Sequence, residues 1–224
     1  MDKKGGKSVE KSMYSLILMD EVVRKIDELA HSKGTSRSNL VNQILAERVA
    51  LVTPQKRAEE IFDALARTLR GGGGLQARRT SSAMMQVTSA LNYPYNPTIR
   101  YSVEIGLEGG RYTCEFKVAS RTQSNALRSR LTVFYEVWSQ IESGLMQGLR
   151  FSMAGGGFRR WLAIERAGAL PDSQALGEAI GSYIRLFDKA LKLSVAGEHG
   201  MDMQAYEQIA RLCKQRLEES EIVV

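Results

Sequence analysis

The sequence predicts an α+β protein in two parts. Residues 13–49 hold a short alternating segment and two brief amphipathic segments of helical period. Four glycines at positions 71–74 then interrupt the chain. Beyond them, alternating apolar residues predict an antiparallel hairpin, and longer periodic segments predict helices that pack on it.

The first element is a strand over residues 13–18. Strand side chains alternate between two faces, so the segment has an apolar face and an opposite face: Tyr14, Leu16 and Leu18, and then Met13, Ser15 and Ile17. A strand this short needs a pairing partner to be stable. Since no neighbouring hairpin supplies one, we expect a second copy of the chain to pair with it.

Two helices follow the strand. We expect Asp20 to cap the first, which ends at Gly34, and Ser36 to cap the second, which runs to Val49. Each helix has one apolar stripe, made by Val22, Ile26, Leu29 and Ala30 and by Leu40, Val41, Ile44, Leu45 and Val49. Neither helix can bury its stripe by itself.

Strand, helix, the turn Gly34-Thr35-Ser36-Arg37-Ser38 and helix together resemble a ribbon-helix-helix domain of the CopG or Arc type, which we place at residues 13–52. The resemblance implies a homodimer whose paired strands form a ribbon in the major groove of double-stranded DNA. The resemblance therefore implies that this domain dimerises and binds DNA.

The resemblance also assigns site residues. The base-facing side of the ribbon would carry Lys11, Met13, Ser15 and Ile17. Ser15 can bond a base edge, and Ile17 can contact a thymine methyl group. The backbone amides of Ser36, Arg37 and Ser38 would clamp a phosphate, as helix N-termini do on general grounds.

Charge is consistent with an anionic partner. The 224 residues include 31 Lys and Arg against 25 Asp and Glu, a net charge of +6. Residues 1–12 predict a flexible basic arm whose Lys3, Lys4 and Lys7 reach phosphates. A solvated tail is the alternative reading of these lysines.

Residues 53–70 predict a connecting helix that could extend the dimer, with Thr53 as N-cap and Pro54 at its first position. Residues 71–82 then predict a Gly-rich linker, because the glycine run has no side chains to pack. No Lys-Ser or Lys-Thr pair follows the glycines, which argues against a P-loop.

Residues 83–224 predict a C-terminal α+β domain, an antiparallel hairpin packed by helices. The hairpin strands are expected at 99–107 and 112–118, with a third strand near 84–87. A helix over 127–145 should cover the sheet, although its seam also suits a short coiled coil. Further helices should begin near Asp172 and Asp202.

A second region suggests anion binding. Gly155-Gly156-Gly157 precede Arg159, Arg160 and Trp161, a combination that could hold a phosphate and stack on a base. The alternative is a flexible connector that leads into a helix buried through Phe158, Trp161, Leu162 and Ile164.

The remaining chemistry is sparse. Cys114 and Cys213 fall at apolar positions, and neither they nor His31 and His199 have metal-ligand spacing. We expect no metal, no cofactor and no enzymatic activity, since no catalytic constellation is recognisable. Without a signal peptide or a long apolar run, we expect a cytoplasmic protein that makes no membrane contact.

The sequence therefore favours a homodimeric, sequence-specific DNA-binding regulator of transcription, a repressor that occupies promoters, with higher oligomers left open. A plasmid mobilisation or partition accessory protein is the first alternative, because such proteins also resemble this domain. An antitoxin-like protein-binding module is the second. The role of residues 83–224, and any effector or protein partner of that domain, stays undetermined.

Overall fold

The computed structural model of the chain describes residues 13–49, 53–70, 74–108, 111–164, 171–197, 200–219 and 224. In these residues the helices are α1 (Asp20–Ser32), α2 (Arg37–Arg48), α3 (Pro54–Leu69), α4 (Asn125–Leu145), α5 (Ser173–Ala196) and α6 (Met203–Glu219), with a 3₁₀ turn η1 (Ala154–Gly156). The strands are β1 (Gln76–Arg79), β2 (Met84–Ala90), β3 (Thr98–Glu108), β4 (Arg111–Ser120), β5 (Arg150–Ser152) and β6 (Phe158–Leu162). The chain is therefore α+β, as predicted.

The described strands form one antiparallel sheet in the order β1-β2-β3-β4-β6-β5. The predicted hairpin is β3 and β4, and the predicted third strand is β2. Side chains alternate along β3, where Ile99, Tyr101, Val103 and Ile105 are buried and their neighbours are not. One face of the sheet is thus the core face, as expected for an antiparallel sheet with one solvated side.

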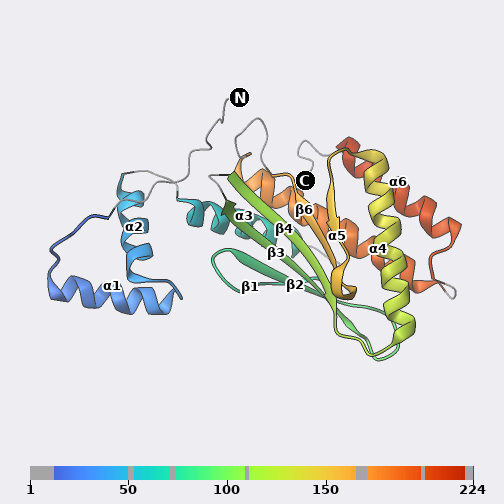
Figure 1. The fold of residues 1–224 in the computed structure, drawn as a ribbon, viewed down its shortest axis with the longest axis horizontal. Coiled ribbons are helices and arrows are strands. Elements are labelled where there is room, and N and C mark those ends of the chain that lie inside the picture. Colours follow the sequence, from blue (N-terminus) through green and yellow to red (C-terminus); the bar gives the residue numbers. More distant parts are fainter. Residues whose placement is uncertain are drawn as a thin grey trace, which may run out of the picture.

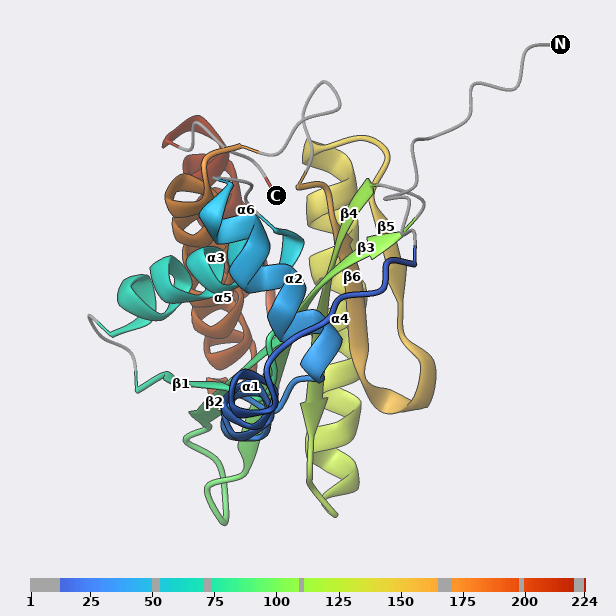
Figure 2. The same ribbon diagram turned by 90° about the vertical axis from the view of Figure 1, so that its left-hand side faces the viewer.

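Helices α4 and α5 cover the core face of the sheet (Figures 1 and 2). Phe187 of α5 lies at the centre, with ring centroids 5.2 Å from both Phe116 of β4 and Phe134 of α4. Trp138 of α4 is fully buried beside the same ring. The apolar seam of α4 therefore packs on the sheet, in place of the coiled coil that was its alternative.

Helix α3 belongs to this core, which differs from the predicted connecting helix at 53–70. Its capping residue Thr53 accepts a hydrogen bond from the Lys56 amide, as expected, but Ile61, Phe62 and Leu65 are fully buried. A Cβ atom on Gly177 of α5 would lie only 2.6 Å from the Ala64 Cβ, so the two helix backbones touch closely. The sequence pattern showed a buried stripe but not its partner.

The predicted linker at 71–82 also contains structure. Residues 76–79 form strand β1, which pairs with β2 at the edge of the sheet. The glycines at 71–73 lie outside the described residues. The C-terminal unit therefore starts at Pro54, and α1 and α2 form a separate pair at one end of the molecule (Figure 1).

A buried polar cluster ties the helices to β6. The Arg160 guanidinium is almost wholly buried and lies 3.3 Å from a Glu142 carboxylate oxygen. Arg160 also donates to the Val224 carbonyl, and the Trp138 indole donates to the Tyr183 hydroxyl. Desolvation raises the pKa of Glu142 despite its cationic neighbour. Such a cluster fixes one arrangement of strand and helices.

Both cysteines are free and buried, as predicted for small core residues. Burial raises the pKa of each thiol to about 12. Among the described helices, none is long and apolar enough to cross a membrane.

Candidate nucleic-acid interface

Residues 13–19 form no strand in the single chain, although the sequence predicts one at 13–18. The physical reason lies in the backbone, since no described strand of the same chain pairs with this segment. All its side chains are exposed, and exposure follows the predicted alternation only in part, because Tyr14 on the predicted apolar face is 83% exposed. Met13 and Ile17 are 99% and 103% exposed, whereas Leu16 and Leu18 are 61% and 41% exposed.

Helices α1 and α2 pack on each other through the buried side chains of Ala30 and Leu40. Gly34 makes the tight turn between them with a φ of +62°, a conformation that disfavours any other residue. Met19 occupies the N-cap position of the first helix without a side-chain capping hydrogen bond, and the predicted cap Asp20 is instead the first helical residue. There its carboxylate still interacts favourably with the helix dipole.

The pair leaves much of its apolar surface uncovered. The exposed apolar side chains of the two helices are Val22, Leu29, Ile44, Leu45 and Val49. The apolar segment at 13–19 adds further apolar side chains that the single chain leaves exposed. Apolar surface of this extent is typical of an interface.

The start of α2 has the geometry of an anion site. The Ser36 hydroxyl accepts a hydrogen bond from the Asn39 amide, so Ser36 is the N-cap that the sequence predicts. Within the described residues, the amides of Arg37 and Ser38 have no acceptor. Free amides at a helix N-terminus point toward an approaching anion, and the dipole favours its charge.

The Arg37 side chain is already occupied. Its Nε donates to Asp27 Oδ1 at 2.6 Å, and a second nitrogen donates to the other carboxylate oxygen. This hydrogen bonding lowers the pKa of Asp27. Arg37 therefore joins α2 to α1, which leaves its backbone amide as the group available to an anion.

The other predicted phosphate contacts and one predicted base contact fall on the N-terminal arm. Lys3, Lys4, Lys7 and Lys11 lie outside the described residues. The other predicted site residues all lie within residues 13–49: Met13, Ser15, Ile17, Ser36, Arg37 and Ser38.

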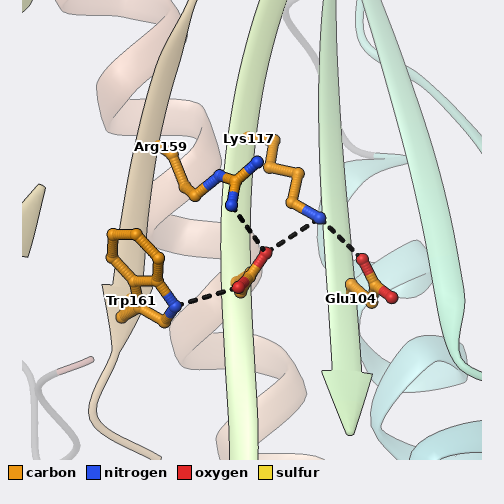
Figure 3. A network of polar contacts seen from close by, with 5 residues as sticks. Glu104, Lys117, Arg159 and Trp161 are labelled. Carbon is orange, nitrogen blue, oxygen red and sulfur yellow. Dashed lines mark hydrogen bonds and ion pairs between the residues drawn. The ribbon is translucent and has the colours of Figure 1, made fainter. Parts of the chain in front are cut away.

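A second polar site lies on the sheet face away from the core, where Lys117 and Arg159 stand side by side on β4 and β6 (Figure 3). Lys117 Nζ lies 2.7 Å from Glu104 and 2.8 Å from Glu115. Glu115 also accepts from the Trp161 indole at 2.9 Å and lies 3.9 Å from Arg159. Its hydrogen bond with Lys117 lowers the pKa of Glu115, and the bond to Glu104 raises that of Lys117.

The structure overturns the helix predicted after Gly155–Gly157, whereas the predicted phosphate and stacking site stays a prediction. Residues 158–162 form strand β6, not a helix, so alternate side chains point to opposite faces. Phe158, Arg160 and Leu162 enter the core, while Arg159 and Trp161 do not. Of the two predicted arginines, only Arg159 is available to an external ligand.

A small hollow of about 140 Å³ lies beside this network. Its lining includes Lys117, Ser152, Gly157 and Arg159. Gly157 is required by space, because a Cβ there would lie 2.9 Å from the Val118 carbonyl oxygen. Sequence reasoning missed Lys117, since only strand register places it beside Arg159.

No group of His, Cys, Asp and Glu in the described part of the chain is suited to hold a metal ion. The chain matches no protein-family model, and no curated protein or solved structure is significantly similar to it.

Proposed function

We propose that this protein is a homodimeric, sequence-specific DNA-binding protein that regulates transcription, with residues 13–49 as its DNA-binding unit. The observation that carries the proposal is the exposed apolar segment before α1. Its backbone lacks a partner among the described strands, and its apolar side chains Tyr14, Leu16 and Leu18 are all exposed. A second copy supplies the same segment in antiparallel orientation and completes a two-stranded ribbon.

Ribbon pairing accounts for the uncovered apolar surface. In a symmetric dimer, the faces of α1 and α2 meet their own copies, which buries side chains such as Ile44 and Leu45. The more exposed face of the segment then remains outward, with Met13, Ser15 and Ile17 toward the major groove. The dimer is thus the unit that binds DNA.

The two α2 N-termini of the dimer hold the flanking phosphates. The free amides of Arg37 and Ser38 donate to phosphate oxygens, which positions the ribbon but reads no sequence. Sequence is read by the ribbon side chains and by DNA shape. Occupancy of a promoter by this dimer would exclude polymerase.

Two substitutions at Arg37 separate the effect of its backbone amide from that of its side chain. Arg37→Pro removes the N–H at the first helical position, where proline is favoured, and Ser36 already has the extended backbone that proline requires. Arg37→Ala removes the same side chain, with its contact to Asp27, but retains the amide. The difference between the two variants therefore reports the amide.

Binding is measured by fluorescence anisotropy on duplexes selected from a random pool by the wild-type protein. We expect Arg37→Pro to bind every duplex several-fold more weakly than Arg37→Ala. Equal binding by the two variants would show that the Arg37 amide does not hold a phosphate. Failure of the wild-type protein to select any sequence would contradict sequence-specific binding.

A further inference from the structure

The sheet face away from the core forms a polar surface that neither the ribbon nor the core uses. We call it the outer face and define it by twelve of the side chains that strand register places there: Arg78, Gln86, Thr88, Arg100, Ser102, Glu104, Glu115, Lys117, Arg150, Ser152, Arg159 and Trp161. None of these side chains is in the buried core. Five are cations and two are carboxylates, which leaves an excess of three positive charges.

One row of this surface crosses the sheet from β1 to β5. The paired positions are Arg78, Gln86, Ser102, Lys117, Arg159 and Ser152, in that order. Strands lie about 4.8 Å apart, so the row is about 24 Å long. It contains three cations and three uncharged hydrogen-bonding groups, without a carboxylate.

The next row contains the aromatic residue of the surface. Trp161 lies opposite Glu115 on one side and Arg150 on the other. The Arg150 guanidinium lies 4.8 Å from the Trp161 ring centroid and the Arg159 guanidinium 5.6 Å. Arg150 is exposed and has no ion-pair partner among the described residues, so a nucleobase can take its place on the ring.

The carboxylates hold Lys117 in place but neutralise little of the charge of Arg159. The Glu115 side chain is 25% exposed and holds Lys117 and the Trp161 indole, whereas Arg159 is 47% exposed and lies 3.9 Å away. Arg159 thus keeps most of its five N–H donors free for a ligand. The hollow beside it, lined by Ser152 and Gly157, accommodates a group of phosphate size.

We infer that the outer face binds single-stranded nucleic acid. Lys117, Arg159 and Ser152 contact a backbone phosphate at the hollow, and an unpaired base stacks on Trp161. Bases of a duplex are stacked within the helix and cannot reach the indole, which favours a single strand. This site is separate from the ribbon and does not depend on the proposed function.

The chain offers a built-in spectroscopic reporter. Trp138 is fully buried, whereas Trp161 is partly exposed on the outer face. The full chain is titrated with an oligothymidylate of about twelve nucleotides. We expect quenching of indole emission that is lost in Trp161→Phe and kept in Trp138→Phe.

Affinity for the same labelled oligonucleotide is followed by anisotropy. Trp161→Ala should weaken binding about tenfold or more, and Arg159→Gln should weaken it and reduce its salt dependence. Arg211→Gln is the matched control, because Arg211 is exposed on α6, in the helical layer. It should change the affinity less than twofold.

Three results would overturn the inference: unchanged emission, equal affinities of Trp161→Ala and Arg211→Gln, or equal binding of a duplex of the same length with the same quenching. The ribbon is tested apart from this site. Arg37→Pro should weaken duplex binding without affecting the oligothymidylate, and Arg159→Gln should do the reverse. Failure of one proposal is thereby distinguished from failure of the other.

Discussion

Leu16→Ser should weaken the proposed dimer, in which the paired ribbon would bury this side chain. Leu16 is 61% exposed in the single chain. Full burial of a leucine side chain contributes about 1.5–3 kcal/mol, so burying the exposed part contributes about 1–2 kcal/mol per copy. A symmetric dimer contains the residue twice, and the expected loss is about 2–4 kcal/mol. At about 1.4 kcal/mol per tenfold, the dimer Kd rises by between thirty-fold and several hundred-fold.

The adjacent residue provides the matched control. Ile17 is fully exposed and lies on the groove face of the proposed ribbon, so Ile17→Ser should leave the dimer Kd almost unchanged while it weakens DNA binding. Sedimentation equilibrium and mass photometry over a dilution series give the Kd of each variant. Equal shifts for Leu16→Ser and Ile17→Ser would refute the assignment of faces. A wild-type chain that stays monomeric at micromolar concentration would refute the dimer.

Three further predictions concern the C-terminal unit. Gly177→Ala should lower the free energy of unfolding in denaturant by about 1–3 kcal/mol, because a Cβ there overpacks the contact with α3. Gly144→Ala is the control, since Gly144 lies in open space on α4, and it should leave the free energy of unfolding unchanged or raise it by up to about 1 kcal/mol. Tyr101→Phe should cost about 1.5–3 kcal/mol in the same assay, because it removes the buried hydrogen bond to Asp188, and an unchanged midpoint would contradict that role. The Cys114 thiol, whose pKa is raised to about 12, should resist alkylation at pH 8 until the protein unfolds. Because the folded state holds this proton more tightly, stability should fall from about pH 9 to 12, and a flat profile would contradict the burial.

The sequence predicted local structure well where one period dominates. The alternation in β3 and β4 and the helical repeat in α4, α5 and α6 were read correctly, since each element has one buried face. The start of α2 at Ser36 was also read correctly, because an N-cap is a local hydrogen bond. These features need no knowledge of the rest of the fold.

Features that depend on partners were not predictable in the same way. A buried stripe on α3 does not say whether it meets a second chain or α5, and only the close approach at Gly177 decides this. Strand β6 was read as a helix because Arg160, a buried cation, breaks the apolar pattern of the strand. Lys117 lies beside Arg159 because of the pairing register of β4 and β6, which are distant in sequence.

The most direct test of the central claim is retention of duplex fragments of the host genome by the purified protein, at low and near-physiological salt, with sequencing of the retained DNA. We expect enrichment at near-physiological salt of a short inverted repeat upstream of a gene, lost in Leu16→Ser at concentrations where that variant is monomeric. Retention at low salt only, with no shared sequence, would contradict sequence reading by Met13, Ser15 and Ile17.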